Sequence, residues 1–348
     1  RRKEIKKAVY ETLCNYPVPF VPLKIKSLVR SFSNIRLIPY SKHMKIMGLT
    51  YSQMIRFANT MDACTDYYAE SDLYIVYYND IEKSITLSNR YRWNIAHELG
   101  HIILKHQKTH NKTRIFRSEL SDSEYDELED EADYFAQLIL VPHVVLYAFN
   151  ISTEWQLKNF CQISGHAAYH RFRDYKQWAK QINRNDAYDN PLFHYYYNFI
   201  YKKHCRTCDA YFIQSNGKYC PICGNKTLEW GDGKMRYLSR IVLDQNSKAV
   251  RCPVCDNEEI LPNGNYCHIC GTFLVNHCTS TDYCGKLATA NARYCIHCGA
   301  PTTFFNNNLL KAWNQEKFDT SNESFNGFAD VPDDYGSDNS EDEDFPFI

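Results

Sequence analysis

The stretch RWNIAHELGHIILKH, residues 92–106, places His97, Glu98 and His101 in an otherwise apolar run. Residues four apart project from one face of a helix, so both imidazoles can bind the same metal ion. Glu98 lies beside them, where a carboxylate can act as a general base on water. This HExxH pattern predicts a zinc site with His97 and His101 as ligands and Glu98 as the catalytic residue. The alternative is a core helix with a few satisfied polar groups, and a third ligand would decide.

Two candidate third ligands close to the motif fail. Metzincins need Gly and His at fixed places after the second histidine, but positions 104 and 107 are Leu and Gln. His106 follows His97 by nine residues, about half a turn net on a continuous helix. His106 is therefore expected to point away from the metal, towards solvent or behind the ligands.

A glutamate on a second helix remains, and DELEDEADYFAQLILVP, residues 126–142, supplies it. Glu129 is the predicted third ligand, with Asp133 one turn later orienting a ligand histidine. Glu131, on the opposite edge of the buried stripe, is the second choice. The predicted stripe consists of Leu128, Ala132, Phe135, Ala136 and Ile139.

AHELGH followed at this distance by EDEADYFAQLILVP resembles the ImmA/IrrE family of metallopeptidases. The resemblance covers most of residues 1–182, including YIVYYND and LKNFCQISGHAAYHRFRDY. Asp133 stands where the family usually has Asn. The resemblance implies a zincin-like fold and a zinc-dependent endopeptidase that cuts helix-turn-helix (XRE-type) repressors, derepressing mobile-element or stress genes.

Alternating helix and strand patterns predict an α+β metallopeptidase domain over residues 1–182. The run at 73–78 could offer an edge to an extended substrate or be an ordinary buried strand. Residues 161–175 could be misread as a DNA-reading helix-turn-helix, but the resemblance places them inside the peptidase domain. Helices are expected at 3–14, 21–32, 92–106, 124–140, 153–162 and 166–182, and strands at 34–40 and 73–79.

Twelve of the fifteen cysteines lie between 205 and 298, after a predicted linker at 183–204; Cys14, Cys64 and Cys161 are isolated. Paired C-x-x-C knuckles without a secretory signal favour metal ligands over disulfides. Residues 205–224 and 252–271 share the spacing of a zinc ribbon, and 278–299 repeats it with a longer first knuckle. His277 or His297 could compete there as a ligand. The predicted structural zinc ligands are Cys205, Cys208, Cys220, Cys223, Cys252, Cys255, Cys267, Cys270, Cys278, Cys284, Cys295 and Cys298.

Charge favours a protein partner for the ribbons over nucleic acid, although a purely structural role stays open. Residues 205–298 carry ten Lys or Arg and eight Asp or Glu. Three four-thiolate zinc sites add about −2 each, so the region becomes acidic. The tail, residues 318–348, has ten acidic and no basic residues and is expected to be disordered.

The expected protein is a cytoplasmic zinc endopeptidase with one catalytic and three structural zinc ions, acting on a regulatory protein. No apolar run approaches the roughly 20 residues of a membrane-spanning helix, so no membrane partner is expected. One alternative is a non-catalytic regulator or adaptor that binds its partner through the ribbons. Another is a toxin or defence protease. Glu98 separates catalysis from adaptor function, because a structural metal site needs no base.

Overall fold

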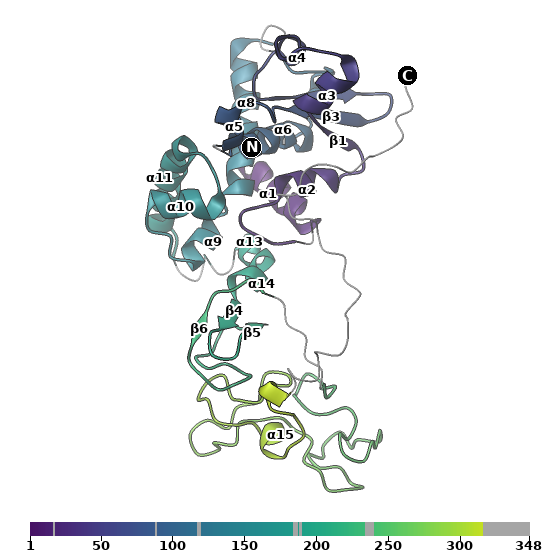
Figure 1. Cartoon of the computed structure of the whole chain (residues 1–348), viewed down its shortest axis with the longest axis vertical. Coiled ribbons are helices and arrows are strands. Elements are labelled where there is room, and N and C mark those ends of the chain that lie inside the picture. The colour runs from purple at the N-terminus through teal and green to yellow at the C-terminus, as the bar shows by residue number, and fades with distance from the viewer. Residues whose placement is uncertain are drawn as a thin grey trace. The chain divides into compact units, whose positions relative to one another are not determined.

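The chain divides after Ile200 into two compact units in a computed structural model (Figure 1). The structure describes residues 1–315 except 17, 88, 117–119, 184–186, 188–189 and 234–239. The acidic tail predicted at 318–348 lies outside these residues. No helix within the described ranges has the length and hydropathy of a membrane-spanning segment.

Unit 1 is built on a three-stranded mixed sheet with β3 (Leu73–Tyr78) in the centre. β1 (Ile35–Pro39) pairs with β3 in parallel, and β2 (Ala63–Tyr68) pairs with it antiparallel. Tyr74, Val76, Tyr77 and Tyr78 are buried, as β-branched and aromatic residues of a central strand should be. Of the two possibilities left open for residues 73–78, the ordinary buried strand is the one observed, because β1 and β2 flank β3 on both sides.

Helices α6 (Arg90–Ile103) and α8 (Asp122–Leu140) pack closely against each other in this unit. α8 begins at a capping box between Ser121 and Glu124 and ends before Pro142. The predicted apolar stripe of α8 is buried. Gly100 lets the backbones approach, since a Cβ there would lie 3.1 Å from the Cα and the carbonyl oxygen of Ala132. The mixed α+β architecture is confirmed.

The other helices of unit 1 surround this centre. α1 packs on α8, and α9, α10 and α11 lie together (Figure 1). The helix predicted at 21–32 is confined to 25–30, because Pro19 and Pro22 disfavour helical backbone before them. The bounds are α1 Arg2–Cys14, α2 Ile25–Arg30, α3 Tyr40–Met47, α4 Tyr51–Ala58, α5 Lys83–Leu87, α7 His106–Thr109, α9 His143–Ala148, α10 Glu154–Cys161, α11 Gly165–Gln181, α13 Pro191–Tyr195 and α14 Tyr197–Ile200.

The segment treated as a linker, 183–204, contains regular structure. α13 and α14 belong to unit 1, where α13 contacts α1. Unit 2 begins with β4 (Lys202–Cys205), which pairs antiparallel with β5 (Ala210–Ile213) and β6 (Leu228–Glu229). Beyond this small sheet, the described part of unit 2 consists of turns, isolated bridges and the short helix α15 (Thr303–Asn306).

Candidate active site and zinc ribbons

His97 and His101 of α6 and Glu129 of α8 lie together in unit 1. Their nearest ligand atoms are all within 4.8 Å of one another. Glu129 reaches both rings: its Oε2 is 3.3 Å from His97 Nε2, and its Oε1 is 3.5 Å from His101 Nε2. Two imidazole nitrogens and one carboxylate oxygen are a donor set that a catalytic zinc ion takes. The group can therefore hold a metal ion.

Asp133 lies one turn after Glu129 and contacts the other nitrogen of the first histidine. Its Oδ1 is 2.9 Å from His97 Nδ1, so it fixes the ring with Nε2 directed at the site. Burial would lower the pKa of His97, but the hydrogen bonds to Asp133 and Glu129 outweigh it and raise the pKa to about 10. Burial would likewise raise the pKa of Glu129, but His101 and His97 lower it instead. The carboxylates thus favour positive charge here.

Glu98 follows His97 on α6 and faces the sheet edge. The Thr65 hydroxyl, from β2, donates a hydrogen bond of 2.6 Å to Glu98 Oε2. This bond leaves Oε1 available to accept a proton. Glu98 is a carboxylate beside the candidate metal ligands, and the Thr65 hydroxyl holds it in place. It is therefore suited to the role of general base.

His106 does not lie on one continuous helix with His97 and His101. α6 ends at Ile103, and Lys105 adopts a left-handed conformation with φ 63°, which turns the chain back. His106 is consequently 1% exposed, and its Nδ1 lies 2.9 Å from His101 Nδ1. Of the two positions expected for His106, towards solvent or behind the ligands, the second is the one observed. Burial first, and then His101, lower the pKa of His106 to about 4.

Glu131, the second choice for third ligand, lies outside the ligand group. Its Oε2 is 3.2 Å from His106 Nε2, and the Arg1 guanidinium donates to both of its oxygens. Burial would raise the pKa of Glu131, but Arg1 and His106 lower it. Glu131 thus completes a chain that runs from Arg1 through His106 to His101.

A cavity of about 940 Å³ lies over this site. Its walls include β2, both metal-site helices and the start of α11. The α11 residues were not predicted as part of the site, although His166 and His170, four apart on a helix, were a visible signal. The polar and aromatic lining includes Trp93, Tyr125, His166, His170 and Arg171.

Comparison with known families agrees with this geometry. Residues 66–173 match the family model Peptidase_M78, described as the IrrE N-terminal-like domain. The chain carries an IrrE N-terminal-like domain. The matched range contains the HExxH helix, the glutamate helix and the cavity-lining part of α11, so the domain is of metallopeptidase type. No curated protein matches the chain.

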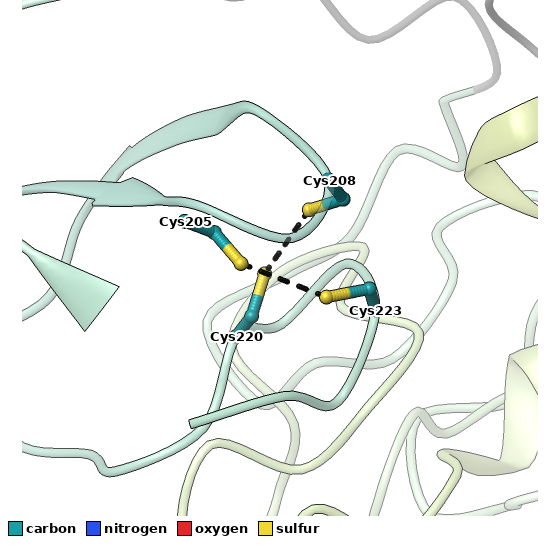
Figure 2. Close-up of side chains that lie close together, drawn as sticks. All are labelled: Cys205, Cys208, Cys220 and Cys223. Atoms are coloured by element: carbon teal, nitrogen blue, oxygen red, sulfur yellow. Dashed lines mark hydrogen bonds between the residues drawn. The ribbon is translucent and has the colours of Figure 1, made fainter. Parts of the chain in front are cut away.

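Unit 2 contains three four-cysteine groups, each able to hold a metal ion. In the first, shown in Figure 2, the turn between β4 and β5 supplies Cys205 and Cys208, and a second loop supplies Cys220 and Cys223. All four sulfurs point towards one another. The Ile222 N–H and the Asn225 amide donate to the Cys220 and Cys223 sulfurs, which favours thiolates.

The other two groups follow the same plan. The second is Cys252, Cys255, Cys267 and Cys270, and the third is Cys278, Cys284, Cys295 and Cys298. Neither candidate competitor belongs to the third group: His277 Nδ1 lies 2.8 Å from the Cys278 carbonyl oxygen, and His297 is not among the grouped residues. The irregular first knuckle still converges on four sulfurs.

Proposed function

We propose that the chain is a zinc-dependent endopeptidase that cleaves a regulatory protein, with a helix-turn-helix repressor as the expected substrate. The observation that carries this proposal is the convergence of His97, His101 and Glu129 beside Glu98 in an open cavity. A purely structural site would need neither the cavity nor the base. The twelve ribbon cysteines then hold three structural zinc ions, making four per chain.

The roles of the residues follow from their positions. A zinc ion on the two histidines and Glu129 would supply Lewis acidity and lower the pKa of water towards neutrality. Glu98 takes a proton from the attacking water and returns it to the leaving amine. Thr65 holds the Glu98 carboxylate towards the cavity, and Asp133 keeps the His97 ring in position.

The sheet edge supports an extended peptide as substrate. The Tyr67 N–H donates to the Thr113 carbonyl on the side of β2 away from β3. Alternation along an antiparallel strand places the N–H and C=O groups of Ala63 and Thr65 on that same side. Both residues line the cavity, so an extended peptide can pair with β2 beside Glu98.

The test is cleavage of the repressor encoded beside this chain's gene, with the fragments identified by mass spectrometry. Glu98→Gln should lower the rate about 10²–10⁴-fold while leaving zinc content unchanged, because it removes a base and no ligand. Glu127→Gln makes the same change at an exposed position of α8 and should have no effect. Undiminished turnover by Glu98→Gln refutes the mechanism. Cleavage of other proteins but not of this repressor refutes only the substrate assignment.

A further inference from the structure

Ribbons 1 and 3, at 205–224 and 278–299, pair through their second knuckles, which have nearly the same sequence. The knuckles read YCPICG at 219–224 and YCIHCG at 294–299. The Lys218 and Tyr219 N–H groups donate to the Ile296 carbonyl at 2.8 and 3.1 Å. The equivalent Arg293 and Tyr294 N–H groups donate to the Pro221 carbonyl at 2.8 and 3.0 Å. Equivalent residues of the two knuckles donate and accept the same hydrogen bonds, so the two knuckles are related by a local two-fold axis.

The side chains repeat this symmetry. A Cβ built on Gly224 would lie 2.9 Å from the Tyr294 ring, and a Cβ built on Gly299 would lie 2.6 Å from the Tyr219 ring. Each tyrosine therefore covers the glycine of the other knuckle. Both glycines have positive φ, and their missing side chains provide the space for the rings. A knuckle with these features is complementary to a copy of itself.

Ribbon 2, at 252–271, has such a knuckle, YCHICG at 266–271. Its internal hydrogen bonds are the same: Cys267 N–H to the Thr272 carbonyl and Gly271 N–H to the Cys267 carbonyl, both 2.8 Å. The corresponding pairs in ribbon 3 are Cys295 to Ala300 and Gly299 to Cys295. Gly271 has φ 71°, as its counterparts do. The backbone that pairs in ribbons 1 and 3 is thus present a third time.

This third knuckle is uncovered in the described part of the chain. Tyr266 is 62% exposed and Ile269 is 65% exposed, whereas Ile222, the equivalent of Ile269 in ribbon 1, is 2% exposed. No atom lies within 4 Å of a Cβ built on Gly271. Within the described ranges, neither the Tyr266 N–H nor the His268 carbonyl has a backbone partner. The Tyr266 N–H, the His268 carbonyl and the space over Gly271 are therefore unoccupied in the described part of the chain, while the exposed Tyr266 ring packs on Phe273 with ring centroids 5.0 Å apart.

We infer that the knuckle of ribbon 2 docks onto the same knuckle of a second copy of this chain. Self-complementary surfaces produce two-fold dimers, because each position meets its counterpart from the other side. Residues 265–272 contain no Lys, Arg, Asp or Glu, so the charge that each copy brings to the contact is that of its zinc–thiolate group, as in the contact between ribbons 1 and 3. One knuckle is smaller than a standard interface, so the dimer is weak and reversible. This inference does not depend on peptidase activity.

Sedimentation velocity of the full zinc-loaded chain tests the inference over roughly 1 to 200 µM, the range of weak interfaces. The chain should pass reversibly from monomer to dimer. Tyr266→Ser should raise the dissociation constant at least about tenfold, because it removes the ring that covers the partner's glycine. Tyr283→Ser is the matched control: this tyrosine is 93% exposed elsewhere in unit 2, and its loss should leave association unchanged.

A second variant distinguishes loss of the dimer contact from unfolding of ribbon 2. Gly271→Asn keeps a residue that tolerates positive φ but places a Cβ where the partner's ring would lie. It should also weaken the dimer, with the zinc content of the unmodified chain retained in both variants. A chain that stays monomeric throughout the range overturns the inference. So does a dimer that both variants leave intact.

Discussion

The two units hold their candidate metal ligands by opposite means. In the IrrE-like domain the ligands stand on helices whose inner faces are fully buried, including Ile95, Leu99 and Phe135. In ribbon 1 the buried cluster is Cys205, Ala210, Cys220 and Ile222, so half of its members are ligands. Helix packing can position a metal site without the metal, whereas about twenty residues cannot bury enough apolar surface to fold without it. Metal removal should therefore have different consequences in the two units.

The largest expected difference is between one ligand substitution in each unit. Cys220→Ser should unfold ribbon 1, because structural zinc contributes about 10–16 kcal/mol that is also folding energy. His101→Ala should lose one zinc ion but leave the IrrE-like domain folded. Limited proteolysis and zinc analysis distinguish the two outcomes. If α6 and α8 became sensitive to protease in His101→Ala, helix packing alone would not hold this domain together without the metal.

Alanine substitutions of Glu129 and Glu131 test which glutamate is the third ligand of the candidate active site. Glu129→Ala should lower the zinc count from the proposed four to three, since its carboxylate reaches both histidines. Glu131→Ala should leave four ions at saturation and weaken only one of them, by about 10–100-fold, through His106. Zinc titration with a fluorescent chelator measures both. The reverse pattern would show that the ligand assignment is wrong while the enzyme class stands.

The candidate active site depends on close packing of α6 against α8, and a substitution of Gly100 tests this packing. Gly100→Ala places a methyl group against the Ala132 backbone, so α6 and α8 must separate. The free energy of unfolding should fall by about 1–3 kcal/mol, with weaker zinc binding at this site alone. Gly165→Ala is the control, because no atom lies within 4 Å of its added carbon. Denaturant titration of the two variants should give changes of opposite sign or clearly different size.

The last difference appears only on acidification and concerns a buried histidine of unit 1. Burial lowers the pKa of His143 to about 4, and its Nε2 has no hydrogen-bond partner in the described structure. In the unfolded chain His143 is therefore protonated near pH 6.5, whereas in the folded domain it is protonated only near pH 4. Between those values stability falls as pH falls, by about 2 kcal/mol at pH 5.

Urea denaturation at pH 7 and at pH 5 measures the loss of stability on acidification. His143→Phe should remove the part of this loss that comes from His143. His194→Phe, at an exposed position of α13, should leave the loss unchanged. An identical pH dependence in wild type and His143→Phe would rule out His143 as its source.

Local spacing was enough to identify the two helices that carry the candidate metal ligands. HExxH predicted a helix with His97 and His101 on one face, and the acidic helix placed Glu129 where the structure brings it. His106 was expected to face solvent or to lie behind the ligands, and the left-handed Lys105, which follows the end of α6, decides between the two by turning His106 towards His101. Spacing cannot reveal a turn that depends on one residue's conformation.

Other features depend on contacts between distant segments, which no local pattern shows. β2, sequence ACTDYY, was missed because Asp66 makes it look like a polar loop. In the structure Asp66 is buried and accepts two hydrogen bonds from Arg114, which lies far along the chain. The repeat in the cysteine region was plain in the sequence, but the knuckle pairing between ribbons 1 and 3 was not.

That pairing has a consequence for the order in which unit 2 can form during synthesis. The two partners are separated by the whole of ribbon 2, so their contact closes a long loop and cannot assist the first steps of folding. A nascent chain exposes the Tyr219 knuckle until Cys295 and Cys298 have left the ribosome. During that interval the freshly made ribbons 1 and 2 both present unpaired knuckles. If the knuckle of ribbon 2 has the complementarity inferred above, its pairing with ribbon 1 would compete with the final contact during that interval.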